Sequence, residues 1–254
     1  MPYAQVNDRK LYYTQSRAKG PDAPTLMLIH GAGGNHLHWP GGLRRIEGAN
    51  VYALDLPGHG RSDGPGCDSI ADYVGVVIEF LDAIEVGRAV LVGHSMGGAI
   101  SQTTALTHPE RVAGLVLVGT GARLRVHPGI LVGILEDFDG TVDLITRWLW
   151  AEGAPEELMR LGREALAATP AQVTHGDFVA CDAFDVTDRL GEIAAPTLVV
   201  AGAADKLTPL KYGQYLAEHI PNARLVTVEG GGHMMALEQP GVVAEAVNEF
   251  ITAL

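Results

Sequence analysis

The chain has 254 residues, of which 47% are hydrophobic and 19% charged, and its formal net charge is −12. This length favours one large α/β domain with an insertion, and no apolar run is long enough to span a bilayer, so a soluble protein without a membrane partner is expected. The negative charge argues against nucleic acid as a partner and mildly against anionic substrates, so a neutral small molecule is the expected substrate. A monomer or homodimer is the expected assembly.

The first residues and the cysteines bear on the cellular compartment. Residues 1–8 lack the basic segment followed by an apolar stretch that is typical of a secretory signal. Cys67 and Cys181 lie far apart and without metal-ligand spacing, so two reduced thiols are predicted rather than a disulfide. We therefore expect a cytoplasmic protein.

Strand and helix patterns alternate along most of the chain. The turn-prone pair Asn7-Asp8 predicts a hairpin of the first residues at a sheet edge. The later strands are mostly continuously apolar, as strands covered on both faces must be, and they are predicted at 25–29, 51–56, 89–92, 115–118, 197–201 and 225–228. Helices are predicted from the capping box at Ser69 to about 84, after Ser95, at 209–219 and from 242 onwards. This alternation predicts a doubly wound, mostly parallel α/β sheet.

The pattern changes between residues 121 and 190. Amphipathic stretches at 144–150 and 156–168 occur there without intervening strands. We interpret 121–190 as a helical cap insertion in a core domain formed by 1–120 and 191–254. Because the insertion follows a strand, it should lie over the carboxyl ends of the strands, where open α/β sheets bind ligands; two packing helices without substrate contact are the alternative.

The most informative motif is Gly93-His94-Ser95-Met96-Gly97, which joins an apolar strand to a helix. Flanking glycines allow the sharp turn that exposes a serine hydroxyl, and the amides at the start of the helix favour negative charge beside it. The motif predicts that Ser95 is a nucleophile. We expect the neighbouring His94 to pack beneath the turn.

A serine nucleophile needs a base and a group that orients the base. His233 follows the predicted strand 225–228 and a glycine-rich loop that could reach Ser95. Asp205 follows the strand 197–201 at its carboxyl end, although an aspartate in such a loop often only caps a helix. The amide of Met96 is one predicted oxyanion donor, and the loop His30-Gly31-Ala32-Gly33-Gly34 should supply another, from Ala32 first and Gly33 second.

These motifs resemble the α/β-hydrolase fold superfamily over nearly the whole chain, in particular its small esterase-like and peroxidase-like members with a helical cap. The resemblance rests on the segments 30–34, 55–63, 93–98, 202–209 and 232–240 and on the order Ser95, Asp205, His233. It implies that 121–190 is the cap of that fold and that His59 and Arg61 in the segment 55–63 are scaffold. It is far less specific for the substrate.

Several further residues are candidates for the substrate pocket or for a metal site. Trp39, Phe138, Leu144, Trp148 and Met234 are pocket candidates, while helical spacing makes core contacts between cap and body an equal alternative for those in the insertion. The histidines at 36, 38 and 59 lack an acidic partner at ligand spacing, so neither a metal nor another cofactor is expected.

The predicted function is that of a serine hydrolase that cleaves a small to medium carboxylic ester through an acyl-enzyme. A lactonase, a carbon–carbon bond hydrolase or a cofactor-free perhydrolase on the same fold are alternatives, and a small-molecule receptor with a vestigial triad is a further one. Serine at position 95 argues against haloalkane dehalogenation, because the resemblance to this family implies a carboxylate as the nucleophile of that reaction.

Overall fold

The computed structural model describes residues 2–18, 20 and 23–254. Within it an eight-stranded sheet has the order β1-β2-β4-β3-β5-β6-β7-β8. The strands are β1 (Tyr3–Val6), β2 (Arg9–Ser16), β3 (Thr25–Ile29), β4 (Asn50–Leu54), β5 (Ala89–His94), β6 (Val112–Val118), β7 (Thr197–Gly202) and β8 (Ala223–Val228). Strands β3 to β8 are parallel, whereas β1 and β2 form the antiparallel hairpin predicted at one edge. The predicted fold class is confirmed.

Two apolar layers cover the two faces of the sheet. Successive residues of β3 point to opposite faces, so Met27 joins one buried cluster and Leu28 joins the other. The first layer comes from α1 (Ile70–Ala83), α2 (Met96–Thr107) and α7 (Leu210–His219). The second comes from α8 (Met235–Glu238) and α9 (Pro240–Thr252). Burial on both faces explains why these strands are continuously apolar in sequence.

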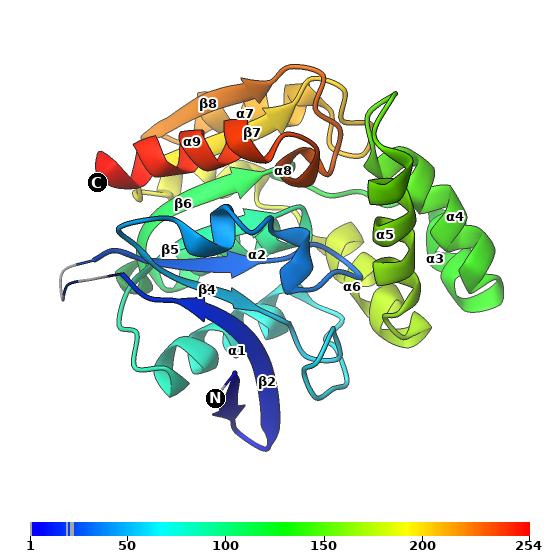
Figure 1. Ribbon diagram of the computed structural model, residues 1–254, viewed down its shortest axis with the longest axis horizontal. Coiled ribbons are helices and arrows are strands. Elements are labelled where there is room, and N and C mark those ends of the chain that lie inside the picture. The colour runs from blue at the N-terminus through cyan, green and yellow to red at the C-terminus, as the bar shows by residue number, and fades with distance from the viewer. Residues whose placement is uncertain (1, 19, 21–22) are drawn as a thin grey trace.

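The chain between β6 and β7 contains the helices α3 (Pro128–Glu136), α4 (Phe138–Leu149), α5 (Glu156–Ala167) and α6 (Ala171–Ala183). We call residues 121–190 the helical segment. It lies at the end of the molecule toward which the arrowheads of the parallel strands point (Figure 1). The helices α3, α4 and α5 share a small apolar cluster of their own, separate from the two layers on the sheet.

Two helices of this segment escaped the sequence prediction. Helix α3 begins at Pro128, where proline is favoured because a first-turn amide needs no partner, and the ring of His127 caps it. Helix α6 packs against both α2 and α3, and its buried side carries Thr174, Gly176 and Asp177 beside apolar residues. A helix of that kind lacks the one-sided apolar stripe on which periodicity depends.

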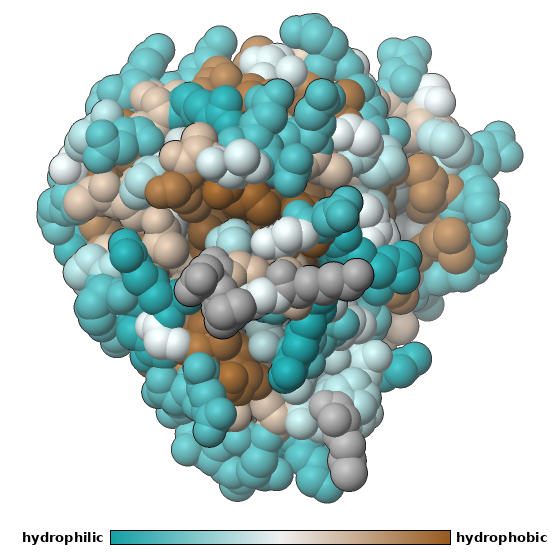
Figure 2. Space-filling model, turned by 60° about the vertical axis from the view of Figure 1, so that its left-hand side comes forward, coloured by the Kyte–Doolittle hydropathy of each residue, from teal (hydrophilic) through white to brown (hydrophobic). Residues whose placement is uncertain are grey.

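The surface agrees with the composition. Hydrophilic side chains cover much of the face in Figure 2, and hydrophobic residues form patches between them. Among the described residues, none of the helices combines the length and the apolar character needed to cross a membrane.

Candidate active site

The chain passes from β5 into α2 through a turn at Ser95. This residue has φ 53° and ψ −115°, a positive φ that non-glycine residues rarely adopt. Two hydrogen bonds from outside the turn hold its backbone: the Ser95 amide donates to the carbonyl of Val118 over 3.0 Å, and the hydroxyl of Thr120 donates to the carbonyl of Ser95 over 2.9 Å. The surrounding structure thus maintains the strained conformation.

The glycines of the turn are required for space. A Cβ atom on Gly93 would overlap the carbonyl of Gly97, and one on Gly97 would overlap the carbonyl of Ile29. Gly31, in the loop after β3, lies so close to Ser95 that an added Cβ would stand 3.1 Å from the Ser95 Cβ. The loop predicted to supply an oxyanion donor therefore packs directly against the predicted nucleophile.

Asp205 and His233 meet beyond the ends of β7 and β8. Nδ1 of His233 lies 2.9 Å from Oδ2 of Asp205, and both residues are buried. The same Oδ2 accepts a hydrogen bond of 2.7 Å from the hydroxyl of Thr208. Burial by itself raises the pKa of Asp205, but the nearby His233 and the hydrogen bonds from His233 and Thr208 hold this pKa below its ordinary value. The carboxylate is therefore charged and orients the imidazole.

His94 packs beneath this arrangement. Its Nε2 donates to the backbone carbonyl of His233 over 3.0 Å, and the two ring centroids lie 4.7 Å apart. Burial, with the neighbouring His233 and His38, lowers the pKa of His94 well below its ordinary value, so the ring is neutral. His94 thus positions the loop that carries His233.

The predicted oxyanion donors differ in what their amides contact. Ala32 lines the same cavity as Ser95, and Met96 is the first residue of α2, so its amide has no acceptor within the helix. The amide of Gly33 instead donates to Oδ2 of Asp177 over 2.7 Å. Gly33 is therefore not available to a substrate oxygen, which corrects the prediction for this residue.

A cavity of about 370 Å³ contains Ser95 and His233 in its wall. Its other walls are mainly apolar and come largely from the helical segment, and Arg125 and Lys206 add two cationic side chains. The apolar and aromatic residues of the wall include Leu124, Val126, Ile130, Ile145, Trp148, Leu149, Trp150, Leu166, Phe178, Tyr212 and Met234. A small or medium organic molecule fits such a space, because apolar walls with a few placed polar groups are typical of ligand sites.

The predicted pocket residues divide into two groups. Trp148 and Met234 line the cavity. Trp39 does not: it is fully buried in the apolar layer on the sheet. Phe138 packs against the cluster inside the helical segment, and Leu144 is 37% exposed. These three are corrected to structural or surface positions.

Several cavity residues were missed by the sequence prediction. Ile145 lies one position after Leu144, and this step of 100° around α4 turns its side chain inward. Phe178 belongs to α6, which periodicity did not find. Thr208 carried a usable signal, since a loop aspartate commonly accepts from backbone amides shortly after it, and Asp205 accepts from both the amide and the hydroxyl of Thr208.

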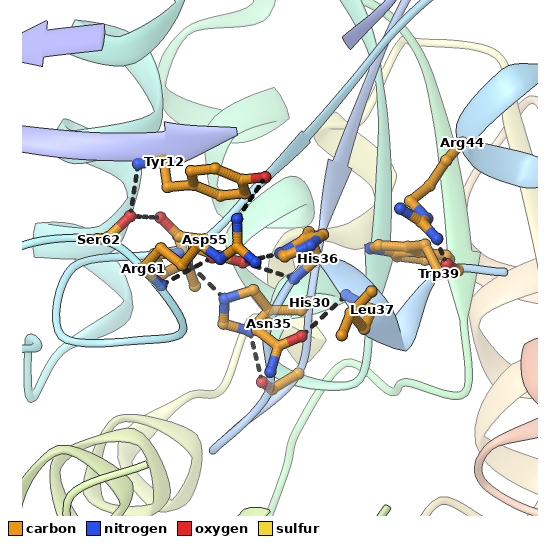
Figure 3. A network of polar contacts seen from close by, with 12 residues as sticks. Tyr12, His30, Asn35, His36, Leu37, Trp39, Arg44, Asp55, Arg61 and Ser62 are labelled. Atoms are coloured by element: carbon orange, nitrogen blue, oxygen red, sulfur yellow. Dashed lines mark hydrogen bonds and ion pairs between the residues drawn. The ribbon is translucent and has the colours of Figure 1, made fainter. Parts of the chain in front are cut away.

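The predicted scaffold turn, residues 55–63, is hydrogen-bonded to the loop after β3 (Figure 3). His30 accepts from the amide of Leu56 at Nε2 over 3.0 Å. Asp55 accepts from the amide and from Nδ1 of His36 over 2.6 and 2.8 Å and from the amide of Arg61 over 3.0 Å. His36 is thus paired with a buried carboxylate.

The sequence that forms this sheet, the turn at Ser95 and the pair Asp205–His233 matches the model of a protein family. The pattern of the alpha/beta hydrolase family covers residues 26–246. The chain belongs to this family.

Relatives of this hydrolase differ in substrate. This chain is 30% identical to a pimeloyl-[acyl-carrier protein] methyl ester esterase of Pectobacterium carotovorum, over 96% of this chain and 99% of that protein. It is 31% identical to a putative carbamate hydrolase of Variovorax paradoxus, over 91% and 93%. Among solved structures, the enol-lactonase of Burkholderia xenovorans superposes with a TM-score of 0.92 at 25% identity, over 99% and 100%. The resemblance stated from the motifs is confirmed for the family and the fold.

Proposed function

We propose that this hydrolase cleaves small to medium carboxylic esters, with Ser95 as nucleophile, His233 as general base and acid, and Asp205 as the residue that orients His233. The observation that carries this proposal is the hydrogen bond of Asp205 to His233, a residue that lines the same cavity as Ser95. A charged carboxylate on Nδ1 leaves Nε2 of the same ring as the proton acceptor, which is the arrangement that activates a serine hydroxyl.

In the first half of the proposed reaction, Oγ of Ser95 attacks the carbonyl carbon while its proton passes to Nε2 of His233. The carbonyl oxygen becomes an oxyanion, and the amides of Ala32 and Met96 donate to it. When the intermediate collapses, the bond from carbon to the alcohol oxygen breaks. His233 returns its proton to the leaving alcohol, and the acyl group remains on Ser95.

In the second half, water attacks the acyl carbon and gives a proton to His233. The second tetrahedral intermediate uses the same two amides. Its collapse breaks the bond to Oγ, which takes the proton back from His233, and the carboxylic acid leaves. The aspartate at 205 keeps its charge throughout and stabilises the imidazolium formed in each half.

We also propose that the helical segment 121–190 is a cap that shapes the substrate space over a core of 1–120 and 191–254. Ile130, Trp148 and Phe178 all belong to this segment and line the cavity. Their apolar surfaces favour an ester whose carbon chain packs against them.

A lactonase is the second candidate. A lactone is a cyclic ester, so the same attack opens it with the alcohol still attached to the product. The similarity to an enol-lactonase over the whole chain favours this candidate.

The test is hydrolysis of p-nitrophenyl esters of increasing acyl length, of lactones and of vinylogous acids, with Ser95→Ala as the control. We expect ester or lactone turnover that falls about 10⁶-fold in kcat in Ser95→Ala. Substantial turnover by the variant would overturn the assignment.

A carbon–carbon bond hydrolase, a perhydrolase and a receptor would each give a different result in the same experiment. Cleavage of the vinylogous acids alone would identify a carbon–carbon bond hydrolase, and acyl transfer to added hydrogen peroxide in preference to water would identify a perhydrolase. Negligible turnover on every compound, with stabilisation by one of them, would identify a receptor and would overturn the proposed hydrolysis.

A further inference from the structure

Asp177 lies on the inner face of α6 and is fully buried. Its carboxylate has partners from three distant parts of the chain. It accepts from the amide of Gly33 over 2.7 Å, from the hydroxyl of Tyr73 over 2.5 Å, and lies 2.8 Å from Nε2 of His59. One side chain of the helical segment therefore holds the loop after β3, helix α1 and the turn 55–63 together.

Gly33 is held by the helical segment on both sides of its backbone. In addition to the bond from its amide to Asp177, its carbonyl accepts from the hydroxyl of Thr169 over 2.9 Å. Its φ is +63°, and an added Cβ would overlap the side chain of Leu166. The conformation of the residue directly after Ala32 is thus set by groups from α6, from the end of α5 and from the turn between them.

The helical segment also contacts the loop that carries His233. The amide of Met234 donates to the carbonyl of Leu149, at the end of α4, over 2.9 Å. Oε2 of Glu238 accepts from the amide of Gly232 over 3.0 Å and from that of Ala151 over 3.4 Å. The helical segment therefore contacts both loops that the proposed reaction uses.

A buried carboxylate is a costly way to attach a helix. Removing its charge from water is unfavourable unless well-placed donors compensate, and apolar packing would attach α6 without that cost. Unlike apolar packing, the carboxylate fixes the positions of the groups around it, because its oxygens accept hydrogen bonds only from donors with suitable geometry. The amide of Ala32, which belongs to the proposed site, is that of the residue directly before Gly33.

The carboxylate of Asp177 favours the protonated form of its partner His59. Burial lowers the pKa of His59, but the charge and the hydrogen bond of Asp177 outweigh it and raise this pKa above its ordinary value. Charge compensation matters because an uncompensated carboxylate beside the loop would oppose the negative charge of an oxyanion.

We propose that Asp177 is a positioning residue: by holding the amide of Gly33 it aims the adjacent amide of Ala32 at the substrate oxygen, so that the oxyanion site is complete only when α6 is seated. This inference rests on the proposed ester or lactone hydrolysis. Donors in such a site must be placed within a fraction of an ångström, because small displacements cost large factors in rate.

The test compares Asp177→Asn with Tyr73→Phe. The first variant keeps the size of the side chain but presents only one carbonyl oxygen to three donors. The second removes a neighbouring hydrogen bond from the same carboxylate and leaves Gly33 attached. For each we would measure kcat and KM, the affinity for an alkyl boronic acid that forms a tetrahedral adduct on serine, the affinity for the matching carboxylic acid, and the melting temperature.

We expect Asp177→Asn to lower kcat by about 10- to 100-fold with little change in KM, and to weaken boronic acid binding by a similar factor without weakening carboxylic acid binding. Tyr73→Phe should lower the melting temperature while keeping kcat within about threefold. If Asp177→Asn loses only thermal stability, or if both variants lose kcat equally, Asp177 has only a structural role and the inference is overturned.

Thr169→Val replaces the first variant if that one does not fold. It removes the hydroxyl from the carbonyl of Gly33, and we expect a smaller loss in kcat and boronic acid affinity of the same kind. Amide hydrogen exchange of residues 31–34 gives a readout that does not depend on turnover: it should rise in Asp177→Asn and not in Tyr73→Phe. Failure of the proposed function is distinguishable, because it appears as missing or Ser95-independent turnover of the unmodified protein.

Discussion

His94 donates a hydrogen bond from Nε2 to the backbone carbonyl of His233 over 3.0 Å, so the residue next to Ser95 supports the loop of its proposed base. The other ring nitrogen, Nδ1, has no hydrogen-bond partner among the residues that the structure describes. The neutral ring of His94 therefore connects the turn at Ser95 directly to the loop that carries His233.

Replacing His94 should affect both stability and turnover. In His94→Leu the carbonyl of His233 loses its donor while it remains buried, which costs about 1–3 kcal/mol in the free energy of unfolding. We expect kcat to fall by about tenfold or more because His233 is less well placed. Urea unfolding and ester kinetics measure the two effects. His94→Gln, which keeps a donor, should recover part of the loss, and a His94→Leu protein with unchanged kcat would contradict this role.

The stability of the protein should fall as the pH falls from 7 to 5. Burial is the main cause that lowers the pKa of His30, His38 and His94, in the case of His38 to about 4. These rings stay neutral in the folded protein, whereas each takes up a proton in the unfolded chain below its ordinary pKa. Each such proton favours unfolding by about 1.4 kcal/mol per pH unit.

His59 acts in the opposite direction, because its pKa is raised. The stabilisation that His59 contributes is complete below its pKa in the unfolded chain, about 6.5, and is lost as the pH rises through its pKa in the folded protein. The three histidines with a lowered pKa outweigh the one with a raised pKa. The urea concentration at the midpoint of unfolding should therefore decrease as the pH falls from 8 to 5. His38→Asn should make this decrease shallower. A midpoint that is constant or rises toward pH 5 would show that the buried rings are not neutral.

Ile145 and Leu144 allow a matched test of the cavity. Ile145 lines it, whereas its neighbour Leu144 is on the surface. Ile145→Ala should shift the preferred ester toward longer acyl chains, at a cost of about 2–5 kcal/mol in stability. Leu144→Ala should leave the chain-length profile unchanged. The measurement is kcat/KM across p-nitrophenyl esters, and identical profiles for the two variants would place the substrate chain elsewhere.

Gly97 and Gly75 form a second matched pair. Gly97→Ala would press a methyl group into the carbonyl of Ile29, so we expect strong destabilisation and loss of turnover. Gly75 lies on the exposed side of α1 with no atom within 4 Å of an added Cβ, and Gly75→Ala should be neutral or stabilising by about 0.5–1 kcal/mol. Thermal unfolding of both variants tests this, and equal melting temperatures would contradict the steric argument.

The local patterns predicted most elements of the core but only part of the site. Strand β4 ends at Leu54 rather than at the predicted 56, and the side chain of the following residue, Asp55, binds the amides of His36 and Arg61. Helix α5 was found within a residue of its bounds, whereas α4 was predicted at 144–150 and spans Phe138–Leu149. Helix α6 was not found, and with it the sequence analysis missed Asp177 and Phe178.

The reason lies in the range of the interactions. The strand pattern, the glycines around Ser95 and the order of Ser95, Asp205 and His233 are readable along the chain, because backbone geometry and periodic burial act between near neighbours. Whether the amide of Gly33 is free was decided by Asp177, which lies 144 positions away. Contacts of that kind arise only when the helical segment packs on the sheet, and no periodicity or spacing in the chain encodes which carboxylate will meet which amide.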